Sequence, residues 1–479
     1  MIGAGLCCSL IMSLSSTEAP ESYLAILPSS SEQYYDDLFD SFKKFNSDER
    51  QKLELLDALA EICVSQGEGE AYASAIETGP ETCTLFIVGN HEEVPRVTQD
   101  YLTDVCRRLT DVAHVADTEG LYKPSIHDLP LRTQESINDI RISILLFTYE
   151  KFLARLTKWN GPWLKRGADI DHRLGDGAEK NKFQELKNSL SVLHQLVTCH
   201  TRDVMTLHQV LSAISRRWKL SNPDTVMFMR RLDVLPRSDK TDVPFSIEQY
   251  LRKVLKTHNE TTKLICFAIS SQRGHIFRNQ PKFVFLRSER RCVELDVKTA
   301  VRTLERHMDT TEQDRVYLDR FINNGGDDQY TCCAHCECAM MVELLKRRGT
   351  QQRPAPIIGV SKLSCFTCHL FFVAYNQARI RLTETDLPSE FVITGAHNTL
   401  YLPWVSPDLT SIDPKLHAGI QQHLLEVARE AAVAHVRSLR RYSGSTPYWA
   451  EDSEVEVMKV NMSLEDILRN WKAKMNISS

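Results

Sequence analysis

The chain has 479 residues, a length that allows about two to four domains of ordinary size. Hydrophobic residues make up 42% and charged residues 25% of the chain, which is typical of a globular protein with a sizeable core. The formal net charge of -5 excludes a chain-wide positive field for binding nucleic acid, although a local basic face stays open. No stretch approaches about 20 uninterrupted apolar residues, so we expect no transmembrane helix and no membrane partner.

The N-terminus predicts an intracellular protein, either cytoplasmic or nuclear. It begins MIGAGLCCSLIMSLSS, which is apolar but lacks the basic residues that open a secretory signal peptide. Of the 14 cysteines, six fall between residues 332 and 368 and the others are scattered, unlike the disulfide framework of a secreted protein.

Residues 1–32 are predicted to be a flexible N-terminus, because residues 17–32 are rich in Ser, Glu and Pro.

Residues 33–270 are predicted to form a large, mainly α-helical region of unknown role. Apolar residues recur at three- and four-residue spacing in INDIRISILLFTYEKFLARL and FQELKNSLSVLHQLV. The run TCTLFIVG is a candidate strand, and the polar, glycine-rich run GPWLKRGADIDHRLGDGAEKN is predicted to be a loop. We interpret this region as a scaffold or a lid, because it carries no recognisable chemistry.

The pattern changes near residue 281. Short strand-like runs (KFVFL, CVELDV, PIIGVS and FVITG) alternate with helix-like runs (KTAVRTLERHM, AMMVELLKRR and CFTCHLFFVAYN). Such alternation predicts an α/β fold, here in a domain over residues 275–410. Residues 411–479 are predicted to form a helical C-terminal tail.

Two short motifs in this domain predict a metal site. His335 and Glu337 open one predicted helix, and Cys365 and Cys368 open the next, directly after a predicted strand. A C-x-x-C pair at a helix start directs both thiols to one centre, where the helix dipole favours thiolates. With His335 as a third ligand, the set predicts a zinc ion whose fourth position is open to water. Zinc would lower the pKa of that water to about 7, and Glu337 is placed to move its proton.

These motifs match the signature of the zinc deaminases, H-x-E followed by P-C-x-x-C, in which the Glu is not a metal ligand. The sequence departs from the signature at Ser364, which stands where the pattern has Pro. The runs HCECAMM, IIGVSKLSCFTCHLFF and GAHNTLYLPW also resemble a largely fungal family of predicted zinc-dependent deaminases in the cytidine-deaminase-like superfamily. Members of that family often carry Ser before C-x-x-C. The resemblance covers about residues 330–405, which is a minority of the chain.

The resemblance implies a cytidine-deaminase-like αβα sandwich, with a central mixed sheet and both motif helices packed on one face. It also implies Zn2+ as cofactor and hydrolytic removal of an exocyclic amine from a cytosine or adenine ring. The nucleobase-containing substrate stays open between a nucleoside, a nucleotide and a nucleic acid. His397 and Trp404 follow the FVITG strand and are candidates for contacting the base at the rim of the pocket, or for a packed loop.

Two further features have alternative interpretations. Cys333-x-x-Cys336 with Cys365-x-x-Cys368 would give a closed four-cysteine structural zinc site in a non-catalytic interaction module. That pattern leaves His335 and Glu337 without roles, and its central gap is long. The basic run Lys346 to Arg348 could steer phosphate to the pocket, or could simply be the solvated end of a helix.

Overall fold

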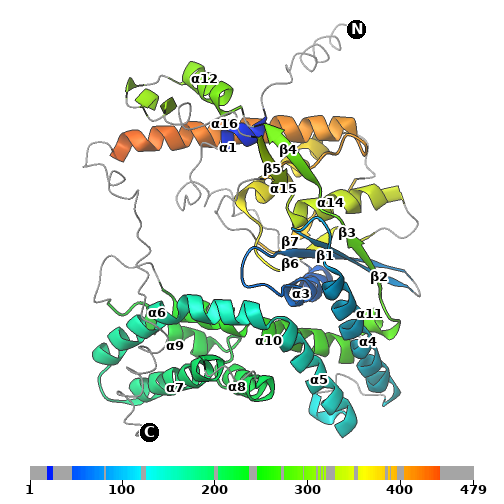
Figure 1. Ribbon diagram of the computed structural model, residues 1–479, viewed down its shortest axis with the longest axis vertical. Helices are drawn as coiled ribbons and strands as arrows, with labels where there is room; N and C mark the ends of the chain where they lie inside the picture. The colour runs from blue at the N-terminus through cyan, green and yellow to red at the C-terminus, as the bar shows by residue number, and fades with distance from the viewer. Residues whose placement is uncertain are drawn as a thin grey trace.

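The computed structural model (Figure 1) shows a mixed α/β protein, as the alternating sequence pattern predicts. It describes residues 19–24, 46–79, 82–119, 126–198, 203–236, 245–270, 274–294, 296–308, 311–319 except 313 and 317, 329–349, 354–382, 387–395 except 389, and 404–442. The strands are β1 (Tyr72–Thr78), β2 (Cys83–Gly89), β3 (Lys282–Leu286), β4 (Arg290–Glu294), β5 (Gln329–Cys333), β6 (Ile357–Val360) and β7 (Val392–Ile393). The helices are α1 (Pro20–Leu24), α3 (Ser47–Ile62), α4 (Arg96–Thr118), α5 (Leu131–Phe147), α6 (Tyr149–Arg173), α7 (Ala178–Thr198), α8 (Val204–Arg217), α9 (Pro223–Asp233), α10 (Ile247–Ile269), α11 (His275–Arg278), α12 (Val297–His307), α14 (Cys336–Lys346), α15 (Phe366–Arg381) and α16 (Pro414–Tyr442).

A five-stranded mixed sheet lies at the centre, in the order β3-β2-β1-β6-β7. The strand β1 pairs antiparallel with both β2 and β6, whereas β3 runs parallel to β2 and β7 runs parallel to β6. The strands β4 and β5 pair separately as a two-stranded antiparallel ribbon. This ribbon leads the chain directly into the histidine motif.

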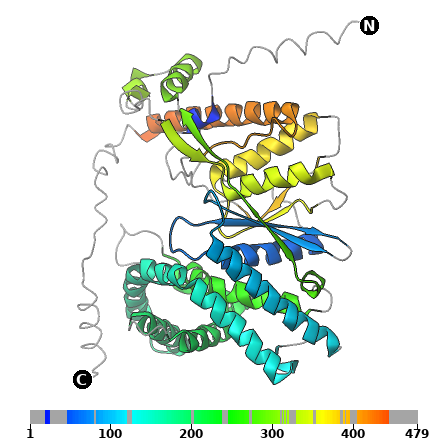
Figure 2. The same cartoon turned by 45° about the vertical axis from the view of Figure 1, so that its right-hand side comes forward.

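Helices cover both faces of the sheet (Figure 2). Because side chains alternate along a strand, Phe86 and Val88 of β2 pack in the core that contains α14, α15 and α16. Leu85 and Ile87 pack in the opposite core, with α3 and α4. A strand that is apolar on both faces is fully covered, and this explains the unbroken hydrophobic run of β2.

The helix α3 packs against β6 at very close range. A Cβ atom on Gly359 of β6 would lie 2.2 Å from the backbone carbon of Leu56 in α3, closer than side chains approach backbone atoms. Glycine is therefore required at this crossing by space rather than by its backbone angles. The crossing fixes the strand whose carboxyl end leads to the cysteine motif.

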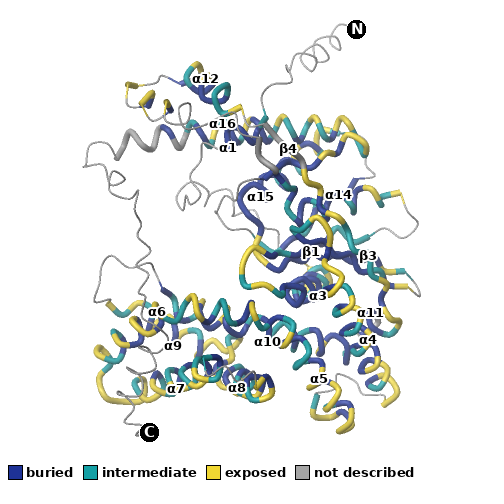
Figure 3. The backbone as a smooth tube through the Cα atoms, viewed as in Figure 1, coloured by how far each residue is buried: buried dark blue, intermediate teal, exposed yellow. Residues whose placement is uncertain are grey.

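The helices α6 to α10 form a third core beside the sheet, and Figure 3 shows their inward faces buried. The predicted loop at residues 161–181 is wrong for most of its length, because α6 continues to Arg173 and α7 begins at Ala178. Trp163 accounts for the difference: its ring packs against Phe183 and Tyr250, and this burial outweighs the local polar and glycine-rich composition.

The sheet does not follow the predicted division between residues 33–270 and 275–410. The hairpin of β1 and β2 comes from the first segment, and β3, β6 and β7 come from the second. The helices between β2 and β3 therefore emerge from the sheet and return to it. The run TCTLFIVG signalled β2, whereas β1 was missed because its residues are mostly small and show no apolar alternation.

The two ends of the chain lie partly outside the described residues. Within residues 1–32, expected to be flexible, Pro20–Leu24 form the buried helix α1, and the Glu21 carboxylate accepts a hydrogen bond from the Ser406 backbone N–H at 3.0 Å. The predicted C-terminal tail includes α16, whereas residues 443–479 lie outside the described part. Among the described helices, none combines the length and apolar character needed to cross a membrane.

Candidate functional site

The turn between β5 and α14 places His335 at a helix N-terminus. The Ala334 N–H donates to the Glu289 carbonyl at 3.1 Å, and the Ser288 hydroxyl donates to the Ala334 carbonyl at 2.8 Å. His335 is the N-cap residue of α14, with an extended backbone, and its carbonyl accepts the helix bond from Ala339 at 2.9 Å. Its side chain makes no capping bond, so the imidazole is available to a ligand.

The cysteine motif repeats this arrangement at α15. Cys365 is the N-cap residue, again extended and without a side-chain cap bond, and its carbonyl accepts from His369 at 3.0 Å. The preceding residue is Ser364, where the zinc-deaminase pattern has proline. The Ser364 N–H donates to the Gly395 carbonyl at 3.4 Å, a bond that proline could not donate.

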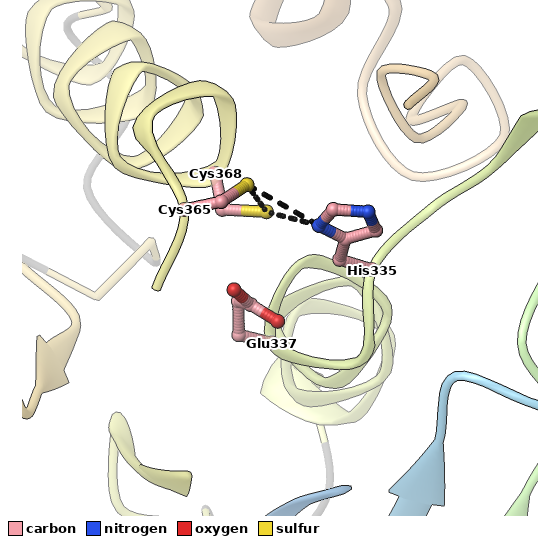
Figure 4. Close-up of side chains that lie close together, drawn as sticks. All are labelled: His335, Glu337, Cys365 and Cys368. Atoms are coloured by element: carbon pink, nitrogen blue, oxygen red, sulfur yellow. Dashed lines mark hydrogen bonds between the residues drawn. The ribbon is translucent and has the colours of Figure 1, made fainter. Parts of the chain in front are cut away.

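The two helix N-termini bring three donor atoms together (Figure 4). The His335 Nδ1 atom lies 3.3 Å from both the Cys365 and the Cys368 sulfurs, and the two sulfurs are 3.3 Å apart. Ligand atoms of these residues and of Glu337 all lie within 4.8 Å of one another. The group could hold a metal ion, as the motif spacing predicts.

The environment of Cys365 favours its thiolate. Burial alone would raise the pKa of this thiol, but its contacts with Cys368 and His335 outweigh burial and hold the pKa well below its ordinary value. The Thr367 hydroxyl, 2.9 Å from the Cys365 sulfur, adds a further hydrogen bond. A thiolate is the form of cysteine that binds a metal.

Glu337 lies in the first turn of α14 and faces the same centre. Its side chain is buried, and its carboxylate oxygen lies 3.3 Å from the Cys336 sulfur. It also lines a cavity that His335 and Cys365 reach. The carboxylate therefore stands beside the candidate metal ligands and faces a cavity that a small molecule could enter.

Residues 334–408 match a family of deaminases. The matching family model is OTT_1508_deam, described as a "-like deaminase", and the matched segment contains both motifs. It covers a minority of the chain, so the likeness concerns this segment. No curated protein and no solved structure matches the chain.

The structure separates the residues of the four-cysteine alternative. Cys333 lies on β5, opposite Arg290 of β4, and Cys336 turns its thiol to Glu337. Neither belongs to the group of described residues that could hold a metal ion. The geometry therefore favours the ligand set of His335, Cys365 and Cys368.

The two residues expected to contact a base differ in outcome. His397 lies outside the described residues. Trp404 is only 1% exposed, pairs with Cys333 through an isolated bridge, and packs in the core behind the site. It does not line the cavity that His335 and Glu337 reach, so the structure gives it a packing role and not a stacking one.

The cavity in front of the site has a volume of about 590 Å³, and the helical region supplies much of its wall. Arg155, Lys158 and Trp159 of α6 and Lys253 of α10 line it beside His335 and Glu337. No sequence motif marks these residues, because only the packing of α6 and α10 brings them to the motifs. The basic run Lys346 to Arg348, at the end of α14, is not among the lining residues, and its Arg347 instead pairs with Glu343 at 2.7 Å.

Proposed function

We propose that this protein is a zinc-dependent hydrolytic deaminase that acts on a cytosine or adenine ring. The observation that carries the proposal is the buried carboxylate of Glu337 beside the mutually close donors of His335, Cys365 and Cys368. The deaminase family match over the same residues supports it. We also propose the cytidine-deaminase-like sandwich for this domain, since both motif helices pack on one face of the mixed sheet.

The donor set fits zinc. One histidine nitrogen and two thiolates are ligands that zinc accepts at about 2.0–2.3 Å, and donors 3.3 Å apart are close enough to share one ion. Three protein ligands are the number found in catalytic rather than structural zinc sites. When bound, zinc supplies the Lewis acidity that makes water a nucleophile near neutral pH.

Glu337 supplies the proton transfer that the reaction needs. The Glu337 carboxylate takes a proton from the attacking water and delivers it to the departing amine. The ring carbon gains the water oxygen and loses its amino nitrogen, so that one water is consumed and one ammonia is released. The burial of Glu337 limits its contact with water to the cavity that it lines, which a bound substrate would fill.

The proposal is tested by ammonia release from cytidine, adenosine, their monophosphates and single-stranded oligonucleotides. We expect the zinc-loaded protein to release ammonia from at least one of them, and Glu337→Gln to lower kcat by about 10²–10⁴-fold. The variant should keep its zinc and its unfolding transition. Equal turnover by the variant, or no ammonia from any of these compounds, contradicts the proposal.

A further inference from the structure

Four cationic side chains converge on the rim of the catalytic cavity. They come from three separate parts of the chain: two from α6, one from α10 and one from the segment between β6 and α15. We call them the cationic rim: Arg155, Lys158, Lys253 and Lys362. Charges on one helix face are usually only solvated, but three segments far apart in sequence meet here around one opening.

The rim is positive against the sign of the whole molecule. The chain has a formal net charge of -5, whereas the cavity lining contributed by the described residues contains two carboxylates, Glu68 and Glu337. Glu337 is already assigned to proton transfer in the proposed reaction. A low-dielectric cleft lined by one sign of charge concentrates ligands of the opposite sign.

Arg155 is held in place without being neutralised. Its guanidinium lies 2.9 Å from Glu61, but the same fully buried carboxylate also contacts Lys151 at 2.7 Å and Lys256 at 3.1 Å. Arg155 therefore shares its carboxylate partner with two lysines, and no second carboxylate among the described residues forms an ion pair with it. Burial, only partly offset by the charge of Glu61, lowers the pKa of Lys151 to about 7.

The lysines of the rim are available to a ligand. Among the described residues, no carboxylate forms an ion pair with Lys158 or Lys362. Lys253 places its ammonium group 4.6 Å from the centre of the Trp159 ring. Burial, and then repulsion by Lys158 and Arg155, lower the pKa of Lys253, as expected for cations gathered without an anion.

We propose that the cationic rim binds a phosphate group on the sugar of the substrate nucleobase, while the base itself lies at Glu337. The inference rests on the proposed deaminase function and narrows its substrate from nucleosides in general to phosphorylated ones. The cavity volume of about 590 Å³ is within the range of about 300–1,000 Å³ common for pockets that hold small organic molecules. The phosphate can be the terminal group of a mononucleotide or a link in a single strand.

Binding to zinc-loaded Glu337→Gln protein tests this inference without turnover. The probes are cytidine and adenosine, their 5′-monophosphates, and a 12-nucleotide single strand. We expect at least one phosphorylated probe to bind roughly tenfold or more tightly than its nucleoside, with an affinity that falls as salt rises. Tight binding of a 5′-monophosphate identifies a terminal phosphate as the group that the rim binds. Tight binding of the single strand alone identifies a phosphodiester.

Charge reversal then locates the site. In the same background, Lys158→Glu and Lys362→Glu should each remove most of the gain from phosphate and leave nucleoside affinity unchanged. The matched control is Lys219→Glu, which reverses another exposed lysine of the helical region outside this cavity. Unchanged affinity in both rim variants, or nucleosides binding as tightly as all phosphorylated probes, overturns the inference.

The same reagents separate this inference from the proposed reaction. Phosphate-dependent binding with no ammonia release by the wild-type protein would overturn the deaminase function and support the phosphate site. Deamination of nucleosides and nucleotides with equal kcat/KM would support the function and overturn the phosphate site.

Discussion

The carboxylate of Glu61 lies 2.7 Å from the ammonium group of Lys151, and both side chains are almost fully buried. Glu61 belongs to α3, which packs against the sheet, and Lys151 belongs to α6, one of the helices that form the third core. The ion pair therefore joins the third core, of α6 to α10, to a helix that packs on the sheet. Lys256 of α10 extends the link, since its ammonium contacts Glu61 and also donates to the Ser361 carbonyl at 2.7 Å, just before the cysteine motif.

We expect Glu61→Gln to lower the free energy of unfolding by roughly 3–5 kcal/mol, because it leaves buried cations without their carboxylate. Urea denaturation at pH 7 measures the loss. The control is Glu185→Gln, which removes an exposed ion pair with Arg217 and should cost less than about 1 kcal/mol. Equal losses of unfolding free energy in the two variants would show that Glu61 does not hold α6 and α10 to α3.

The buried carboxyl of Asp57 is expected to make the folded protein less stable as the pH rises. Burial raises its pKa from 3.8 to about 6, although Val360 and Thr394 donate hydrogen bonds to its oxygens. A carboxyl with a raised folded pKa binds protons in the folded state after the unfolded chain has released them. The stability that the Asp57 carboxyl contributes is therefore fully present below about pH 4, and it is lost as the pH rises through about 6.

The variant Asp57→Asn keeps the size and the acceptor oxygen but removes this titration. Between pH 4 and pH 7 we expect its free energy of unfolding to gain roughly 2–3 kcal/mol relative to the wild type. Urea denaturation of both proteins across this range measures the difference. Two parallel stability curves would mean that Asp57 does not titrate in this range.

Substitution of Trp404 tests whether its side chain packs in the core or contacts the substrate. We expect Trp404→Ala to lower the free energy of unfolding by roughly 3–5 kcal/mol, as for a large buried side chain. Its effect on nucleotide affinity, measured under conditions in which the variant stays folded, should be small. A variant that folds as stably as the wild type but loses nucleotide affinity would show that Trp404 contributes to the binding site and not to the core.

The metal centre and its context differ in how far the sequence predicts them. His335, Glu337, Cys365 and Cys368 were identifiable because each pair opens one helix, so local spacing alone directs the side chains to a common point. The strand β6 and the helices α12, α14, α15 and α16 were likewise predicted from local patterns.

The cavity wall was not predictable from local patterns. Lys158 and Lys253 are 95 residues apart by number and become neighbours of the site only through packing of α6 and α10, which no local pattern encodes. The small residues of β1 carry little apolar signal of their own, and their pairing with β2 and β6 supplies the strand. The burial of Trp404 is equally a consequence of distant contacts.

The metal content of the protein distinguishes an open three-ligand zinc site from a closed structural one. The measurement compares zinc per chain in the purified wild type, His335→Ala, Cys365→Ala and Cys333→Ala, with circular dichroism to establish that each is folded. We expect about one zinc per chain, lost in the His335 and Cys365 variants and kept in the Cys333 variant. Zinc that is lost with Cys333 and kept without His335 would show a closed structural site and contradict the catalytic assignment.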